Sequence, residues 1–174
     1  MRRVGRVPIG IALGVCLSGG CSGTVEIESD EAKRARIKAM YDGYREAFPE
    51  VRAVAVAELE ALGGEQGVLL IDVREPKETT VSRIPGAVTR EEFEAAAESY
   101  RDRTVVTYCT IGYRSGLYAD ELRQRGFDVL NLEGSILAWT HAGLPLAGET
   151  GETKAVHVYG SRWNLAAEGY EAVW

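Results

Sequence analysis

Apolar positions along this chain follow two different periods. Residues 68–71 and 105–108 form continuous runs rich in apolar and β-branched side chains, which is typical of strands buried inside a parallel sheet. Over residues 31–48, in contrast, apolar side chains recur at helical spacing, at Ile37, Met40, Tyr41, Tyr44 and Phe48. This stripe predicts an amphipathic helix, which Pro49 ends.

The rest of the chain continues the alternation of strands and helices. The pattern predicts short strands at 53–56, 128–132 and 155–159, and helices carrying Leu59 and Leu62, over 90–100, from Ser115 to Arg125, and over 135–142. Thr89 and Glu92 have capping-box spacing at the start of the helix over 90–100. Strands that alternate with helices at this spacing predict an α/β domain with a mainly parallel sheet.

One cysteine lies where a predicted strand passes into a predicted helix. Cys109 follows strand 105–108, and the start of the next helix would direct backbone N–H groups and its positive dipole end toward the thiol. Both effects favour the thiolate. Gly112 allows a positive φ, so that the loop can curl into a cup, and Arg114 adds a cation suited to an anionic substrate. This loop is the candidate site.

Four segments, taken together, resemble one known family. The loop Cys109-Thr110-Ile111-Gly112-Tyr113-Arg114-Ser115 is similar to the active-site loop of rhodanese-family sulfurtransferases. The run Asp72-Val73-Arg74-Glu75, the turn Ile84-Pro85-Gly86-Ala87, and Gly134 with Trp139, Gly143 and Pro145 match further family motifs in the family's order, over roughly residues 52–146. The resemblance implies a rhodanese-like α/β fold, with an open, mainly parallel sheet flanked by helices on both faces.

The resemblance also implies a chemistry. Cys109 would be the catalytic nucleophile that carries a persulfide, and Thr110, Ile111, Gly112, Tyr113, Arg114 and Ser115 would form the substrate cup. A small sulfur donor such as thiosulfate or a polysulfide, and a thiol or other nucleophilic acceptor, would be the partners, without a cofactor. Many family members that use thiosulfate carry arginine at the position of Thr110, which leaves the donor open. A catalytically silent binding or sensing module remains the alternative.

The loop length separates this candidate from related phosphatases and arsenate reductases. Four residues lie between Cys109 and Arg114, as in the rhodanese loop, whereas the related enzymes have five. A shorter loop makes a cup that suits a single sulfur atom on the cysteine better than a whole phosphate group. The phosphatase interpretation is therefore disfavoured.

Three charged residues outside the loop leave alternatives open. Asp72 and Arg74 follow strand 68–71 at the sheet edge where α/β sheets keep their sites, and we interpret them as supporting residues that fix neighbouring loops, in preference to direct substrate contacts. Arg83 stands where the family usually has histidine, and could be a cation near the site or a solvated surface charge.

The first 21 residues have the layout of an export signal. Arg2, Arg3 and Arg6 precede an apolar stretch over 7–17, which is too short to span a bilayer, and small residues then lead to Cys21. This end is similar to a bacterial lipobox. We therefore predict a lipid attachment at Cys21 and a membrane-anchored protein on the periplasmic or outer cell-surface side.

Processing at Cys21 would change the number of free thiols and the net charge of the mature chain. Cys16 would leave with the leader and Cys21 would be acylated, so Cys109 would be the one free thiol of the mature chain. A sulfur loaded on Cys109 would then have to leave to an outside acceptor. Loss of the leader arginines would also lower the net charge from −6 to −9, which argues against nucleic-acid binding.

The expected layout of the whole chain has five parts. These are a signal peptide over 1–21, a tether over 22–30, a helix over 31–50, a rhodanese-like domain over 51–147 and an aromatic extension over 148–174. The extension carries Trp163, Tyr170 and Trp174, which predicts that it folds back onto the domain, beside the helix over 31–48. His141 and His157 show no metal-ligand spacing, so they are predicted to be structural. The oligomeric state stays open.

Overall fold

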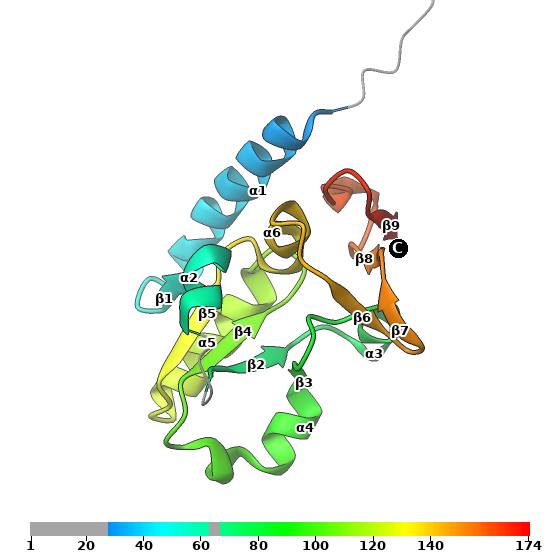
Figure 1. Cartoon of the computed structure of the whole chain (residues 1–174). Coiled ribbons are helices and arrows are strands. Elements are labelled where there is room, and N and C mark those ends of the chain that lie inside the picture. Colours follow the sequence, from blue (N-terminus) through cyan, green and yellow to red (C-terminus); the bar gives the residue numbers. More distant parts are fainter. Residues whose placement is uncertain (1–27, 63–66) are drawn as a thin grey trace, which may run out of the picture.

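A computed structural model describes residues 28–62 and 67–174 of the chain (Figure 1). The predicted signal peptide, including Cys21, and most of the tether lie outside the described residues. Within the described part, no helix has the length and apolar character needed to cross a membrane.

A five-stranded parallel sheet forms the centre of the structure, in the order β1-β5-β4-β2-β3. Its strands are β1 (Arg52–Val54), β2 (Leu69–Asp72), β3 (Val88–Thr89), β4 (Val105–Tyr108) and β5 (Val129–Leu132). The predicted strand over 105–108 is reproduced in full, and those over 53–56, 68–71 and 128–132 shift at their ends by one or two residues. Strand β3 was not predicted. The central strand β4 pairs with both β2 and β5, so its carboxyl end lies in the middle of one sheet edge.

Alternation along the strands divides the core into two clusters, one on each face of the sheet. Val106 and Tyr108 belong to one cluster, and Val105 belongs to the other. The first cluster includes side chains of α1 (Asp30–Tyr44), α2 (Val56–Leu62) and α6 (Ser135–His141), whereas the second includes side chains of α4 (Arg90–Ala95) and α5 (Tyr113–Gln124). The expected parallel sheet between two layers of helices is therefore confirmed.

Two predicted helices have different ends in the structure. The helix over 31–48 ends as α1 at Tyr44 and continues as the 3-10 turn η1 (Arg45–Ala47). The single helix predicted over 90–100 is wrong, because it divides into α4 and the 3-10 turn η2 (Ala97–Tyr100). The Phe93 and Tyr100 rings stack with centroids 5.7 Å apart, whereas seven residues of continuous α-helix would separate them by about 10 Å.

The segment after residue 145 contains elements that the sequence pattern did not reveal. Strands β6 (Leu146–Gly148) and β7 (Gly151–Thr153) form an antiparallel hairpin, which was not predicted. Strand β8 (Ala155–His157) lies within the predicted strand over 155–159, and it pairs in parallel with β9 (Glu171–Val173), which was not predicted. The 3-10 turn η3 (Ser161–Trp163) lies between them. The short helix α3 (Pro76–Thr79) was also missed.

The N-terminal helix and the C-terminal segment are joined by direct bonds. Lys33 donates from Nζ to the carbonyl of Ala166 at 2.9 Å, and the Asp30 carboxylate accepts from the Glu168 N–H at 3.0 Å. Leu165 is fully buried in the cluster that contains α6. Figure 1 shows α6 between α1 and the C-terminal strands, so both ends of the described chain are built onto the same side of the domain.

Candidate active site

Cys109 lies at the carboxyl end of β4, directly before the loop that opens α5. The Gly112 N–H donates to Cys109 Sγ at 3.2 Å, and the Cys109 N–H donates to Ser135 Oγ at 3.1 Å. The predicted positive φ at Gly112 is confirmed, at +115°. The loop therefore curls around the sulfur at the amino end of a twelve-residue helix.

The environment of Sγ favours the thiolate. Burial by itself would raise the pKa of the Cys109 thiol, since only 2% of the residue is exposed. The charge of Arg114 and hydrogen bonds from Ser115 and Gly112 outweigh burial and hold the thiol pKa below its ordinary value. The buried Ser115 hydroxyl has no other hydrogen-bond partner in the described part of the chain, so its O–H is available to the sulfur.

The shape of the loop depends on residues that sequence reasoning missed. Asn131, at the end of β5, donates to the Gly112 carbonyl at 2.9 Å and to the Tyr41 hydroxyl at 3.3 Å. The Tyr41 ring of α1 lies so close to Gly112 that a Cβ there would come within 2.5 Å of it. Gly112 is therefore required both for its backbone conformation and for its fit against α1.

Arg114 does not stand free as the sequence interpretation suggested. Its two terminal nitrogens donate to the two carboxylate oxygens of Glu78 in α3, at 2.6 and 2.8 Å. Glu78 is fully buried, and its Oε1 also accepts from the Thr110 hydroxyl at 3.3 Å. The positive charge beside Cys109 is thus largely balanced, which weakens the expected attraction for a free anion.

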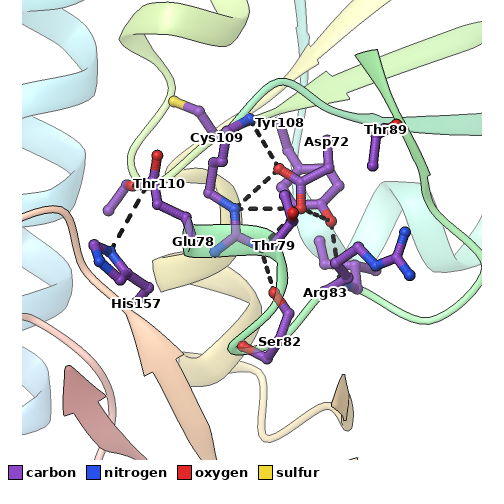
Figure 2. A network of polar contacts seen from close by, with 12 residues as sticks. Asp72, Glu78, Thr79, Ser82, Arg83, Thr89, Tyr108, Cys109, Thr110 and His157 are labelled. Carbon is purple, nitrogen blue, oxygen red and sulfur yellow. Dashed lines mark hydrogen bonds and ion pairs between the residues drawn. The ribbon is translucent and has the colours of Figure 1, made fainter. Parts of the chain in front are cut away.

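Glu78 is the main charged residue of the site that the sequence analysis missed. Burial opposes ionisation of Glu78, but hydrogen bonds from Arg114 and from the Glu75 N–H hold its pKa below the ordinary value. His157 Nδ1 lies 4.0 Å from Glu78 Oε1, and Figure 2 shows its ring directed toward Glu78 and Thr110. The spacing of Glu75 and Glu78 indicates a capping box, which is present, but it gives no sign of the arginine partner.

Asp72 and Arg74 form a separate, fully buried ion pair. Arg74 donates to both Asp72 oxygens, with contacts of 2.9 and 2.7 Å, and also to the Ser82 carbonyl at 2.6 Å. The Tyr108 hydroxyl donates to Asp72 at 2.7 Å and accepts from the Ile84 N–H. Figure 2 shows the Cys109 sulfur directed away from this cluster. The cluster therefore fixes the loop over 73–84 to β4, the strand that precedes Cys109.

The loop lines a cavity of about 380 Å³. Its walls are formed by Tyr44, Cys109, Thr110, Ile111, Tyr113, Arg114, Tyr159 and Trp163. The cavity therefore gives the nearly buried sulfur a route to the surface, and it is the kind of small-molecule site in which chemistry can take place. Sequence reasoning missed the three aromatic residues outside the loop, which come from segments far apart in the chain.

The other charged candidates lie away from the sulfur. Arg83 lines a different cavity and its partly exposed side chain approaches Glu92 at 3.9 Å, which matches the solvated interpretation. His141 Nε2 lies 2.9 Å from the Leu165 carbonyl, in a structural contact between α6 and the C-terminal segment. Among residues 28–62 and 67–174, His, Cys, Asp and Glu side chains form no group of three that could hold a metal ion.

Comparison with known proteins gives a consistent family assignment. The profile of the rhodanese-like domain matches residues 55–142. The chain is 38% identical to a sulfurtransferase of Allochromatium vinosum over 96 residues, which cover 53% of this chain and 90% of the relative. An uncharacterized protein of Synechocystis is 34% identical over 96 residues, covering 53% of this chain and 54% of that protein.

Solved structures agree on the fold. The thiosulfate sulfurtransferase of Pseudomonas aeruginosa superposes with a TM-score of 0.52 at 23% identity, over 64% of this chain and 23% of that protein. At this identity the likeness concerns the fold alone. The matched sulfurtransferase relative adds support for a function of the sulfurtransferase type.

Proposed function

This chain belongs to the rhodanese-like domain family, and on that premise we propose that it transfers sulfane sulfur through a persulfide on Cys109. The observation that carries the proposal is the environment of one atom. Cys109 Sγ accepts from the Gly112 N–H at 3.2 Å, the pKa of this thiol is lowered, and Cys109 lines a cavity. A thiolate held in this way is an activated nucleophile that needs no separate general base.

In the first half-reaction, the Cys109 thiolate attacks the outer sulfur of a donor such as thiosulfate or a polysulfide. A new S–S bond forms to Cys109, and the old bond of the donor breaks. Its electron pair leaves with the remainder of the donor, which is sulfite when the donor is thiosulfate. The persulfide keeps one negative charge, which the N–H groups of the loop from Thr110 to Ser115 stabilise.

In the second half-reaction, a nucleophilic acceptor attacks the outer sulfur of the persulfide. The S–S bond to Cys109 breaks, and its electron pair restores the Cys109 thiolate. Since the enzyme alternates between two covalent states, steady-state kinetics should follow a ping-pong scheme.

Intact mass spectrometry after incubation with polysulfide or thiosulfate tests the proposal. We expect the mass of one added sulfur atom, its removal by cyanide, and no such addition in Cys109→Ser, which should also abolish turnover. The Trp174→Ala variant is a matched control, because Trp174 is 62% exposed and does not line the cavity. A wild-type chain that gains no sulfur would instead support a catalytically silent binding module.

We also propose that the protein is exported and held at a membrane by a lipid on Cys21, on the periplasmic or outer cell-surface side. The support is the basic and apolar leader with small residues before Cys21. The mass of the chain isolated from cell membranes would test this proposal. Cleavage directly before Cys21 with an acyl addition is expected, and an unmodified Cys21 would contradict it.

A further inference from the structure

Most of the aromatic side chains that line the Cys109 cavity come from outside the residues that match the rhodanese-like domain. We call Tyr44, Tyr113, Tyr159 and Trp163 the aromatic wall; all four line the cavity that contains Cys109. Only Tyr113 lies within the matched residues 55–142, whereas Tyr44 belongs to α1, and Tyr159 and Trp163 belong to the C-terminal segment. Three of the four rings therefore lie outside the part of the chain that matches the rhodanese-like domain.

The rings of the aromatic wall form two contacting pairs. The Tyr44 and Tyr113 rings lie with centroids 5.2 Å apart, and Tyr159 meets Trp163 edge to face at 5.3 Å. The Arg114 guanidinium lies 4.9 Å from the centroid of the Tyr159 ring, over its face. The wall thus reaches the charged side chain next to the sulfur.

Tyr159 adopts a backbone conformation that a tyrosine rarely takes. Its φ is +69°, in the left-handed region, and its N–H donates to His157 Nδ1 at 3.1 Å. A strained non-glycine residue persists where the surrounding structure holds it, and such residues gather at ligand sites. Tyr159 is nevertheless 49% exposed as a residue, so burial does not account for the strain.

The charge and size of the cavity favour an organic molecule over a compact anion. Glu78 balances the positive charge of Arg114 through two hydrogen bonds, and the whole chain carries a net charge of −6. The cavity of about 380 Å³ falls within the range of small-molecule sites, ~300–1,000 Å³, and four aromatic rings line it. Aromatic rings of this kind bind apolar or aromatic groups by burial and stacking.

We propose that the aromatic wall binds the apolar body of the sulfur acceptor, a low-molecular-weight organic thiol with a ring-sized apolar group. This inference rests on the proposed persulfide at Cys109. The acceptor thiolate attacks the outer sulfur, the S–S bond to Cys109 breaks, and Cys109 leaves as a thiolate while the acceptor becomes a persulfide. The wall positions the acceptor sulfur in line with that bond, and so determines specificity without taking part in the chemistry.

A comparison of two thiols of similar basicity tests the inference. The full chain is loaded with polysulfide, and its sulfur is discharged to benzyl mercaptan or to 2-mercaptoethanol, with kcat/KM measured for each. We expect wild type to prefer benzyl mercaptan by about tenfold or more, since one ring is withdrawn from water. No preference in a wild-type chain that does load sulfur would overturn the inference alone, whereas failure to load would overturn the proposed function.

Two variants then locate the preference. Tyr159→Asn removes the ring and keeps a residue that tolerates positive φ, and Trp163→Ala removes the neighbouring ring. We expect both to bring the ratio of the two kcat/KM values close to one, whereas Trp174→Ala keeps the wild-type ratio. A general loss of folded enzyme would lower both values equally and leave the ratio intact. An unchanged ratio in both wall variants would therefore overturn the inference, and a protein cysteine as acceptor would become the favoured alternative.

Discussion

Two separate arginine–carboxylate pairs lie near the carboxyl end of β4, and they differ in their access to water. Arg74 and Asp72 are both fully buried at the side chain, in a pair closed further by Tyr108 and the Ser82 carbonyl. Arg114 and Glu78 form an equally direct pair, but 29% of the Arg114 side chain is exposed at the Cys109 cavity. The same type of ion pair is thus found once in the buried interior and once beside the Cys109 cavity.

The difference shows that the exposure of an ion pair to water determines whether it can only fix the structure or can also respond to a substrate. A sealed pair cannot exchange partners without leaving a charge in a medium that solvates it poorly, so it holds loops in place. In the pair at the cavity, the partly exposed Arg114 can turn toward a substrate, because water or the substrate replaces its lost partner, whereas Glu78 stays buried. Breaking each pair should therefore have different consequences for stability and for reactivity.

The largest expected effect follows from breaking the sealed pair. Asp72→Asn keeps the shape of the side chain but leaves the Arg74 cation without a carboxylate, which should cost about 3–5 kcal/mol of unfolding free energy. Urea denaturation followed by circular dichroism measures it. Sulfur loading per folded molecule should stay near wild type, because Asp72 does not line the cavity.

The exposed pair of Lys38 and Asp42 supplies the control. These side chains lie 3.0 Å apart and are more than half exposed, so Asp42→Asn should lower the free energy of unfolding far less than Asp72→Asn does. Equal losses in Asp72→Asn and Asp42→Asn would show that burial does not distinguish the pairs.

Glu78→Gln should have a smaller effect on stability and a visible effect on substrate use. Arg114 is partly exposed and can turn to water, so we expect a loss of about 1–3 kcal/mol. The freed guanidinium should bind an anion better, and the KM for thiosulfate should fall relative to wild type. Steady-state kinetics with thiosulfate and cyanide measure it, and a KM that stays the same or rises would contradict a competition between Glu78 and the donor.

The sequence predicted the parts of the site that depend on local pattern. The strand over 105–108, the positive φ of Gly112 and the placement of Cys109 before a helix follow from residues that are neighbours in the chain. Arg114 was also identified, but its partner was not. Glu78 is 36 residues away from Arg114, and the sequence pattern around it indicates only a capping residue of α3.

The residues that the two ends of the described chain contribute to the site could not be predicted, for the same reason. The stripe over 31–48 predicted a packed helix, but the pattern could not show that Tyr41 would lie against Gly112. Likewise, the aromatic residues of the C-terminal segment predicted burial in general, not that Tyr159 and Trp163 would face the cavity. Such placements arise from tertiary contacts between distant segments, which periodicity does not encode.

The charge of Arg114 should also be visible in the titration of Cys109. Arg114 is the leading influence that lowers the thiol pKa against the effect of burial, so Arg114→Gln should raise that pKa and move the midpoint of the pH-dependent reaction with iodoacetamide to higher pH. Arg114→Lys keeps a cation and should leave the midpoint nearer to wild type, although it cannot reproduce both hydrogen bonds to Glu78. Mass spectrometry of alkylated protein across a pH series measures the midpoints. Equal shifts in both variants would assign the effect to the geometry of the Glu78 contact, whereas a shift confined to Arg114→Gln assigns it to charge, because only that variant removes the positive charge facing the sulfur.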